Sequence, residues 1–142
     1  GAENRIKMVD KRAKKLETLK KEYLSDVEMC ELHGPADADL TLVGWGSTKG
    51  PILEAMEVAN ENGQKVNFLQ IKIVLPFPNE QVAAILGKAK KMVLVENNSE
   101  GQMGGVIREK TGVDITDRLL RYDGRPLNPA EILVKIHSTI GA

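Results

Sequence analysis

The chain has 142 residues, with 20 basic and 20 acidic side chains and one cysteine. A net charge of zero argues against nucleic acid as the main partner, because binding a phosphate backbone needs a basic surface. One cysteine cannot form an intrachain disulfide, an iron–sulfur site or a cysteine zinc site, and it fits a cytoplasmic protein. No apolar run reaches the length of about 18 residues that predicts a membrane span.

The first 26 residues differ in charge from the rest. Residues 1–22 carry eight basic and four acidic side chains, whereas the remaining chain carries twelve and sixteen. Apolar residues recur three or four positions apart over 4–22, which predicts an amphipathic helix with a Lys- and Arg-rich outer face. That face is either simply solvated, or it belongs to a linker helix (1–26) that lies on another domain or subunit.

Residues 27–142 show the pattern of an α/β domain. The stretch 27–32, flanked by glutamates, predicts a short edge strand. Further strands are expected at 40–45, 65–74, 91–97 and 115–122, and helices at 49–62, 79–89, 101–112 and 127–140. Asn79 and Asn128 are expected to cap the helices that begin at them. The alternation predicts a three-layer α/β/α domain with a mostly parallel sheet.

Ligands of such sheets bind at the carboxyl ends of the strands, and three loops are expected there: 44–50, 75–79 and 96–102. The candidate residues for contacts in these loops are Trp45, Ser47, Thr48, Lys49, Phe77, Asn97, Asn98 and Gln102. The two aromatic residues are either packing anchors or interface hot spots. Nothing in the sequence places Glu96 and Glu100 around a substrate as an acid–base pair.

The loop "GWGSTKGP" has the glycines of a phosphate-binding loop but fits neither known template. Lys49 precedes Gly50, which reverses the P-loop order, and it occupies the third glycine position of G-x-G-x-x-G. Two interpretations remain: a turn in which Ser47 or Thr48 caps the next helix, or a helix N-terminus that holds a small anion beside Lys49. The residues alone indicate no catalytic, cofactor-binding or metal-binding side chain.

Four stretches in a fixed order resemble one family. They are "DADLTLVGWGSTKGPILEAME", "LPFP", "VLVENNSEGQMGGVIRE" and "DGRPLNPAEI". Together they are similar to the C-terminal domain of the α subunit of 2-oxoacid:ferredoxin oxidoreductases, over about residues 5–140. The resemblance implies a transketolase C-terminal-like fold, with a five-stranded mixed sheet whose first strand is antiparallel to the others.

The resemblance also implies a function for a larger enzyme. Such enzymes decarboxylate a 2-oxoacid, as in pyruvate or 2-oxoglutarate metabolism, on thiamine diphosphate with Mg²⁺. They form an acyl-coenzyme A and pass electrons through iron–sulfur clusters to ferredoxin. These cofactors would be held by other domains of the α subunit and by a β subunit that carries the diphosphate site. This chain would then be a fragment with a structural, assembly role and no activity of its own.

Two alternatives stay open at this point. The chain could be a stand-alone regulatory α/β module that binds an anion or another small ligand at Ser47–Lys49. It could also be the C-terminal domain of another thiamine enzyme, of the transketolase or dehydrogenase type.

Overall fold

The computed structural model describes residues 28–97, 102–121 and 123–141. The helix expected at 4–22, and with it the division of the chain at residue 26, lies outside these residues and stays a prediction. The strands are β1 (Cys30–His33), β2 (Leu40–Trp45), β3 (Val66–Ile71), β4 (Met92–Glu96) and β5 (Arg118–Leu120). The helices are α2 (Lys49–Glu61), α3 (Asn79–Lys88), α4 (Gln102–Thr111) and α5 (Pro129–Ile140), and a 3₁₀ turn, η1 (Gly46–Thr48), precedes α2.

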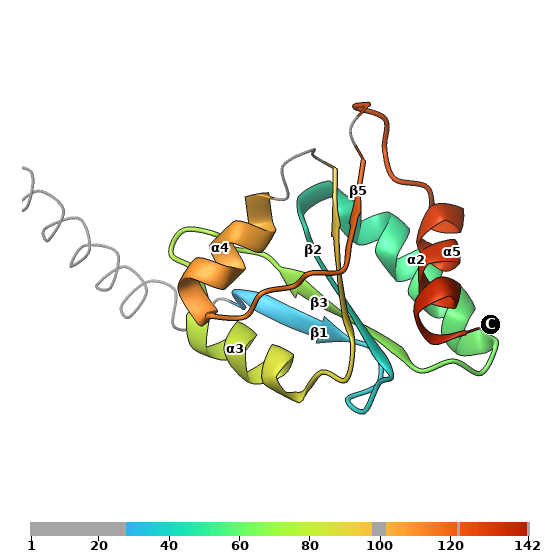
Figure 1. Ribbon diagram of the computed structural model, residues 1–142, viewed down its shortest axis with the longest axis horizontal. Helices are drawn as coiled ribbons and strands as arrows, with labels where there is room; N and C mark the ends of the chain where they lie inside the picture. The colour runs from blue at the N-terminus through green and yellow to red at the C-terminus, as the bar shows by residue number, and fades with distance from the viewer. Residues whose placement is uncertain (1–27, 98–101, 122, 142) are drawn as a thin grey trace, which may run out of the picture.

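The five strands form one mixed sheet in the order β1-β3-β2-β4-β5 (Figure 1). β2 pairs in parallel with both β3 and β4, and β4 pairs in parallel with β5. β1 lies at the edge and pairs antiparallel with β3, with Cys30 opposite Ile71 and His33 opposite Phe68. The mixed sheet with one antiparallel edge strand is therefore confirmed.

Two hydrophobic clusters lie on opposite faces of the sheet. On one face Leu42 of β2 and Phe68 of β3 pack with Ile52 of α2 and with residues of α5. On the other face Val43 and Leu69 pack with residues of α3 and α4. Successive residues of a strand point to opposite faces, so Leu40 and Leu42 supply one cluster and Val43 supplies the other. Figure 1 shows the result, with α2 and α5 on one side of the sheet and α3 and α4 on the other, which confirms the three-layer architecture.

The two expected asparagine caps had different outcomes. The Oδ1 atom of Asn128 accepts the Ala130 N–H at 2.8 Å, so this cap is confirmed. The cap expected at Asn79 is wrong, because Asn79 is already the first helical residue of α3 and Pro78 holds the N-cap position. The Pro78 carbonyl accepts the Val82 N–H at 3.0 Å, and no side chain caps the start of this helix.

The sequence also overestimated the length of two strands. β3 ends at Ile71 rather than at 74, and β5 spans three residues of the expected 115–122. Past β3, both Lys72 and Ile73 donate their N–H groups to the Met29 carbonyl, at 2.9 and 3.2 Å. Two donors on one acceptor break the regular ladder, although Ile73 and Val74 continue the apolar pattern of the strand in the sequence.

Candidate functional site

The buried hydroxyl group of Thr48 stabilises the turn that follows β2. Thr48 is 3% exposed, and its Oγ1 accepts the Trp45 N–H at 3.1 Å and donates to the Trp45 carbonyl at 2.8 Å. Gly46 has φ +61°, a conformation that glycine adopts without strain. Neither Ser47 nor Thr48 caps α2 with its side chain, so that expectation is wrong. The glycines and Thr48 therefore build a strand-to-helix turn.

A buried carboxyl group lies directly beside this turn. Glu96, the last residue of β4, is 0% exposed. Its Oε1 accepts the indole Nε1–H of Trp45 at 3.1 Å and the backbone N–H of Met103 at 2.9 Å. One oxygen thus connects the end of β2, the end of β4 and the first turn of α4. The donor at Met103 lies at a helix N-terminus, where the peptide dipoles favour a negative group.

The side chains at the ends of β2 and β4 form a pocket of about 220 Å³. It is lined by Trp45, Gly46, Ser47, Thr48 and Asn97. The Asn97 Nδ2 donates to the Ser47 Oγ at 3.4 Å across the gap between the two loops. Trp45 is 37% exposed, which makes its indole the large apolar wall of this pocket. Sequence reasoning placed all three of these side chains at one edge of the sheet, and the structure brings them together.

Phe77, Lys49 and Gln102, which were also expected to make contacts, do not line this pocket. Phe77 is 4% exposed and packs in the cluster under α3 and α4, so it is a packing anchor in this fold. Lys49 and Gln102 are exposed at the first residues of α2 and α4, outside the pocket lining. Asn98 lies outside the described residues.

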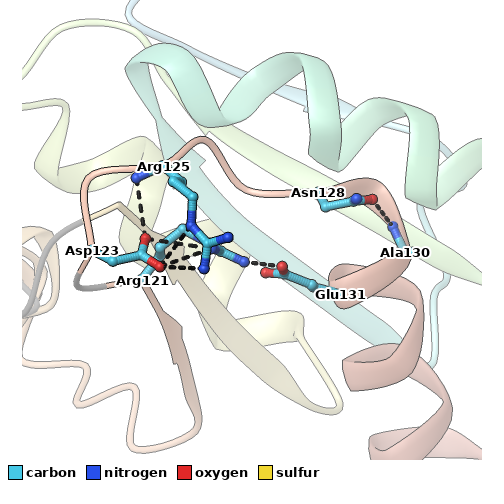
Figure 2. Close-up of polar contacts among 6 residues, drawn as sticks. All are labelled: Arg121, Asp123, Arg125, Asn128, Ala130 and Glu131. Carbon is cyan, nitrogen blue, oxygen red and sulfur yellow. Dashed lines mark hydrogen bonds and ion pairs between the residues drawn. The ribbon is translucent and has the colours of Figure 1, made fainter.

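A second polar cluster fixes the loop between β5 and α5 (Figure 2). Arg121 pairs with Glu131 of α5 and, at 3.4 Å, with Asp123. Arg125 donates from its Nε to the same Asp123 carboxylate at 2.9 Å. This hydrogen bond from the Arg125 side chain is the main reason why the pKa of Asp123 is lowered to about 2. The cluster stabilises a loop, and its carboxylates are already paired with arginines.

The described residues contain no group of three or more His, Cys, Asp or Glu side chains placed to hold a metal ion. Asp123 belongs to the sequence "YDGRPLN", which contains an Asp-Gly pair but not the G-D-G motif of a diphosphate–Mg²⁺ site. Both oxygens of Asp123 accept hydrogen bonds from arginines, so this carboxylate is not available to bind a metal ion. Among the described helices, none combines the length and the apolar character that crossing a bilayer requires.

Comparison with known proteins identifies a family. The family model for pyruvate:ferredoxin oxidoreductase core domain II matches residues 38–132. A 2-oxoacid:ferredoxin oxidoreductase α subunit from Saccharolobus solfataricus is 35% identical over 140 residues, which is 99% of this chain and 22% of that protein. The 2-oxoglutarate oxidoreductase subunit KorA of Mycobacterium tuberculosis is 38% identical over 93 residues, 66% of this chain and 14% of the relative. The chain spans about a fifth of the length of the archaeal α subunits that it matches.

Solved structures give the same result. A 2-oxoglutarate:ferredoxin oxidoreductase from Magnetococcus marinus, with 2-oxoglutarate, coenzyme A and succinyl-CoA bound, superposes with a TM-score of 0.84 at 28% identity, over 99% of this chain and 24% of that one. The α chain of a probable 2-oxoacid ferredoxin oxidoreductase from Thermoplasma acidophilum gives 0.55 at 39% identity, covering 78% and 95%. A split-gene transketolase, at 16% identity and a TM-score of 0.51, shares the fold. This chain therefore belongs to the 2-oxoacid:ferredoxin oxidoreductase family, as a core domain II of the α-subunit type.

Proposed function

We propose that this chain is a non-catalytic assembly domain of the α subunit of a thiamine diphosphate-dependent 2-oxoacid:ferredoxin oxidoreductase. The observation that supports this role is the half-exposed Trp45 at the carboxyl edge of the sheet, held in place by the buried Glu96. A tryptophan that is fixed before binding loses little side-chain freedom on contact, and buried aromatic anchors dominate the energy of protein interfaces.

The chemistry of the whole enzyme belongs to other parts of it in this proposal. The oxidative decarboxylation of a 2-oxoacid to an acyl-coenzyme A, with reduction of ferredoxin, would take place where other α-subunit domains meet a β subunit. Thiamine diphosphate, Mg²⁺, the iron–sulfur cluster and coenzyme A would be bound there. In this proposal the isolated chain would be inactive, because the groups that carry the reaction would lie on other α-subunit domains and on the β subunit. A cytoplasmic location fits the single cysteine, Cys30, which is a free thiol.

The contact surface that we propose is the pocket wall of Trp45, Ser47 and Asn97, extended by Lys49 and Gln102 at the starts of the two adjacent helices. Asn98 remains a member from the sequence alone. Phe77 is left out, because a core side chain cannot contact a partner.

The test uses the full α subunit co-expressed with its β subunit. Trp45→Ala is expected to shift the complex toward free subunits in size-exclusion chromatography and native mass spectrometry. Val134→Ala is the matched control, because Val134 is an exposed apolar residue on α5, outside the pocket. Urea unfolding of both variants as isolated chains checks that the substitutions leave the domain folded. Intact assembly with Trp45→Ala would contradict the proposed role.

One result would support the ligand-binding alternative instead. If the isolated chain binds phosphate or coenzyme A, and Lys49→Ala abolishes that binding, the turn is a ligand site and the assembly role loses its basis. Dye reduction by the assembled complex, with 2-oxoacid and coenzyme A, separates a ferredoxin-type enzyme from the domain of another thiamine enzyme.

A further inference from the structure

Glu96 is an unusual residue for the interior of this domain. Glutamate is almost never fully buried unless it is paired, because its carboxyl group loses its hydration. Among the described residues, no lysine, arginine or histidine forms an ion pair with it, although it is 0% exposed. Among the described residues, two N–H groups donate to it, the indole of Trp45 and the backbone of Met103, both to Oε1.

Capping the start of α4 does not require a residue as large as glutamate. The N–H of Met103 at the start of α4 needs an acceptor, and Asp, Ser or Asn near the helix start normally supplies it. The additional contact of Glu96 reaches a side chain 51 positions away in the sequence. Capping of α4 does not explain this hydrogen bond from the indole of Trp45 to Glu96. The ring that it holds belongs to the proposed contact surface.

The backbone and the ring of Trp45 are held by different groups. Thr48 binds both the N–H and the carbonyl of Trp45 and so fixes its backbone. Within the described residues, the indole N–H donates to Glu96. An indole N–H held at 3.1 Å defines the direction in which the exposed face of the ring points. The hydrogen bonds within the turn fix only the backbone of Trp45, so without Glu96 the indole could rotate about its side-chain torsions.

We propose that Glu96 is a positioning residue that holds the indole of Trp45 in the orientation used for contact with the β subunit. The contact itself rests on the function proposed above, whereas the orientation of the ring is a property of this chain. The two parts can therefore fail separately.

The first experiment measures the ring directly in the isolated chain. Trp45 is the single tryptophan of the sequence, so its indole N–H resonance and its fluorescence anisotropy report on this one side chain. In the parent chain the indole N–H is expected to exchange with solvent much more slowly than in a free tryptophan, and the anisotropy is expected to decay with the tumbling of the whole chain. An indole that exchanges as fast as free tryptophan would overturn the proposal without any variant.

Two substitutions then separate the hydrogen bond from the charge. Glu96→Gln keeps one oxygen acceptor for both N–H groups. The second carboxyl oxygen, Oε2, is buried and has no hydrogen-bond partner among the described residues, so replacing it removes no contact within them. We expect Glu96→Gln to retain slow indole exchange, and Glu96→Ala to give fast exchange and a rapid local component in the anisotropy decay. Glu57→Ala, an exposed glutamate on α2, is the control for loss of a charge.

Other outcomes decide against the proposal. A folded Glu96→Ala chain with unchanged indole exchange would show that packing alone orients the ring. A folded Glu96→Gln chain that behaves like Glu96→Ala would show that the acceptor geometry is not what matters. If Glu96→Ala does not fold, Glu96→Met takes its place, because methionine fills similar space without an acceptor oxygen and should give the same fast indole exchange.

The second experiment measures assembly in the full enzyme. Releasing one tryptophan side chain is expected to weaken association about three- to tenfold, since the ring must then be ordered on binding. Glu96→Ala should have this effect in the parent and little further effect in a Trp45→Ala background. If Trp45→Ala leaves assembly unchanged while Glu96→Ala still frees the indole, the proposed interface fails and the positioning by Glu96 stands. If both variants weaken assembly but to additive extents, Glu96 acts independently of Trp45 and the positioning role is refuted.

Discussion

Gly44 is the residue of the β2 turn at which a single methyl group should matter most. It lies in the buried part of β2, one residue before Trp45. A Cβ added at this position would be 2.6 Å from Ile52 Cδ1 and 2.7 Å from Thr48 Oγ1. Both distances are far shorter than a normal van der Waals contact. We therefore expect Gly44→Ala to destabilise the domain.

The magnitude follows from what the two neighbours can do. Ile52 is 0% exposed in the core, so moving its methyl group disturbs packing, and overpacking typically costs about 1–3 kcal/mol. Thr48 can move only by weakening its hydrogen bonds to Trp45, at about 1 kcal/mol each. Replacing a strand glycine by alanine returns about 0.5–1 kcal/mol. The net loss should be about 2 kcal/mol in the free energy of unfolding.

Urea unfolding of the chain, followed by the fluorescence of Trp45, measures this loss. With an m-value of about 1–3 kcal/mol per M, the midpoint should fall by about 0.7–2 M. Gly105→Ala is the control, because nothing lies within 4 Å of an added Cβ at this exposed helical position. Alanine there should stabilise α4 by about 0.5–1 kcal/mol. A Gly44→Ala chain within about 0.5 kcal/mol of the parent would refute the reasoning from close contacts.

Three further predictions concern single groups. Asn128→Ala should lower the free energy of unfolding by about 1 kcal/mol through loss of the α5 cap, whereas Asn128→Asp should not; equal urea midpoints for both would contradict the cap. Burial, and after it the charge of Glu28, raise the pKa of the Cys30 thiol. Iodoacetamide should therefore alkylate Cys30 more slowly than free cysteine near pH 8, and Glu28→Gln should speed the reaction. A rate equal to that of free cysteine would contradict this prediction. The pKa of Asp123 lies at about 2, below the ordinary 3.8, so its carboxylate contributes stability above about pH 4 that is lost as the pH falls through about 2; carboxyl NMR should show that midpoint, and Arg125→Gln should raise it.

The fold could be predicted because its signals are local. Strands buried on both faces appear as continuous apolar runs, as in 40–45, and helices carry their own start signals, as at Asn128. The antiparallel edge strand was implied by the family resemblance, and the glutamates beside it indicated only that it lies at an edge. Where a local signal had a competitor, the prediction was wrong. Pro78 holds the N-cap position of α3, and Asn79 is its first helical residue. The sequence alone does not distinguish an asparagine at the N-cap from one at the first helical position.

The site was only partly predictable, because its contacts join distant segments. The rule that ligand loops follow parallel strands brought Trp45, Ser47 and Asn97 together correctly. It could not separate them from Phe77, since the burial of a residue between two prolines depends on how its loop folds over α3. Glu96 was noted as a polar residue of the loop, but its role was missed. A glutamate that ends an apolar strand immediately before a helix is the signal that could have found it.

The position of Glu96 also bears on the choice between an anion site and a contact surface. The loop 46–49 has the features that favour an anion: a helix start, a nearby lysine and glycine in the turn. Yet the wall of the pocket is the Trp45 ring, whose N–H is already donated to a carboxyl oxygen, and the Thr48 hydroxyl is used within the turn. Two donors that could have faced an anion are thus consumed internally. What the pocket presents instead is an oriented aromatic face with an amide and a hydroxyl at its rim. That arrangement suits a protein partner better than a phosphate group, and the effect of Lys49→Ala on phosphate binding is the measurement that would reverse this conclusion.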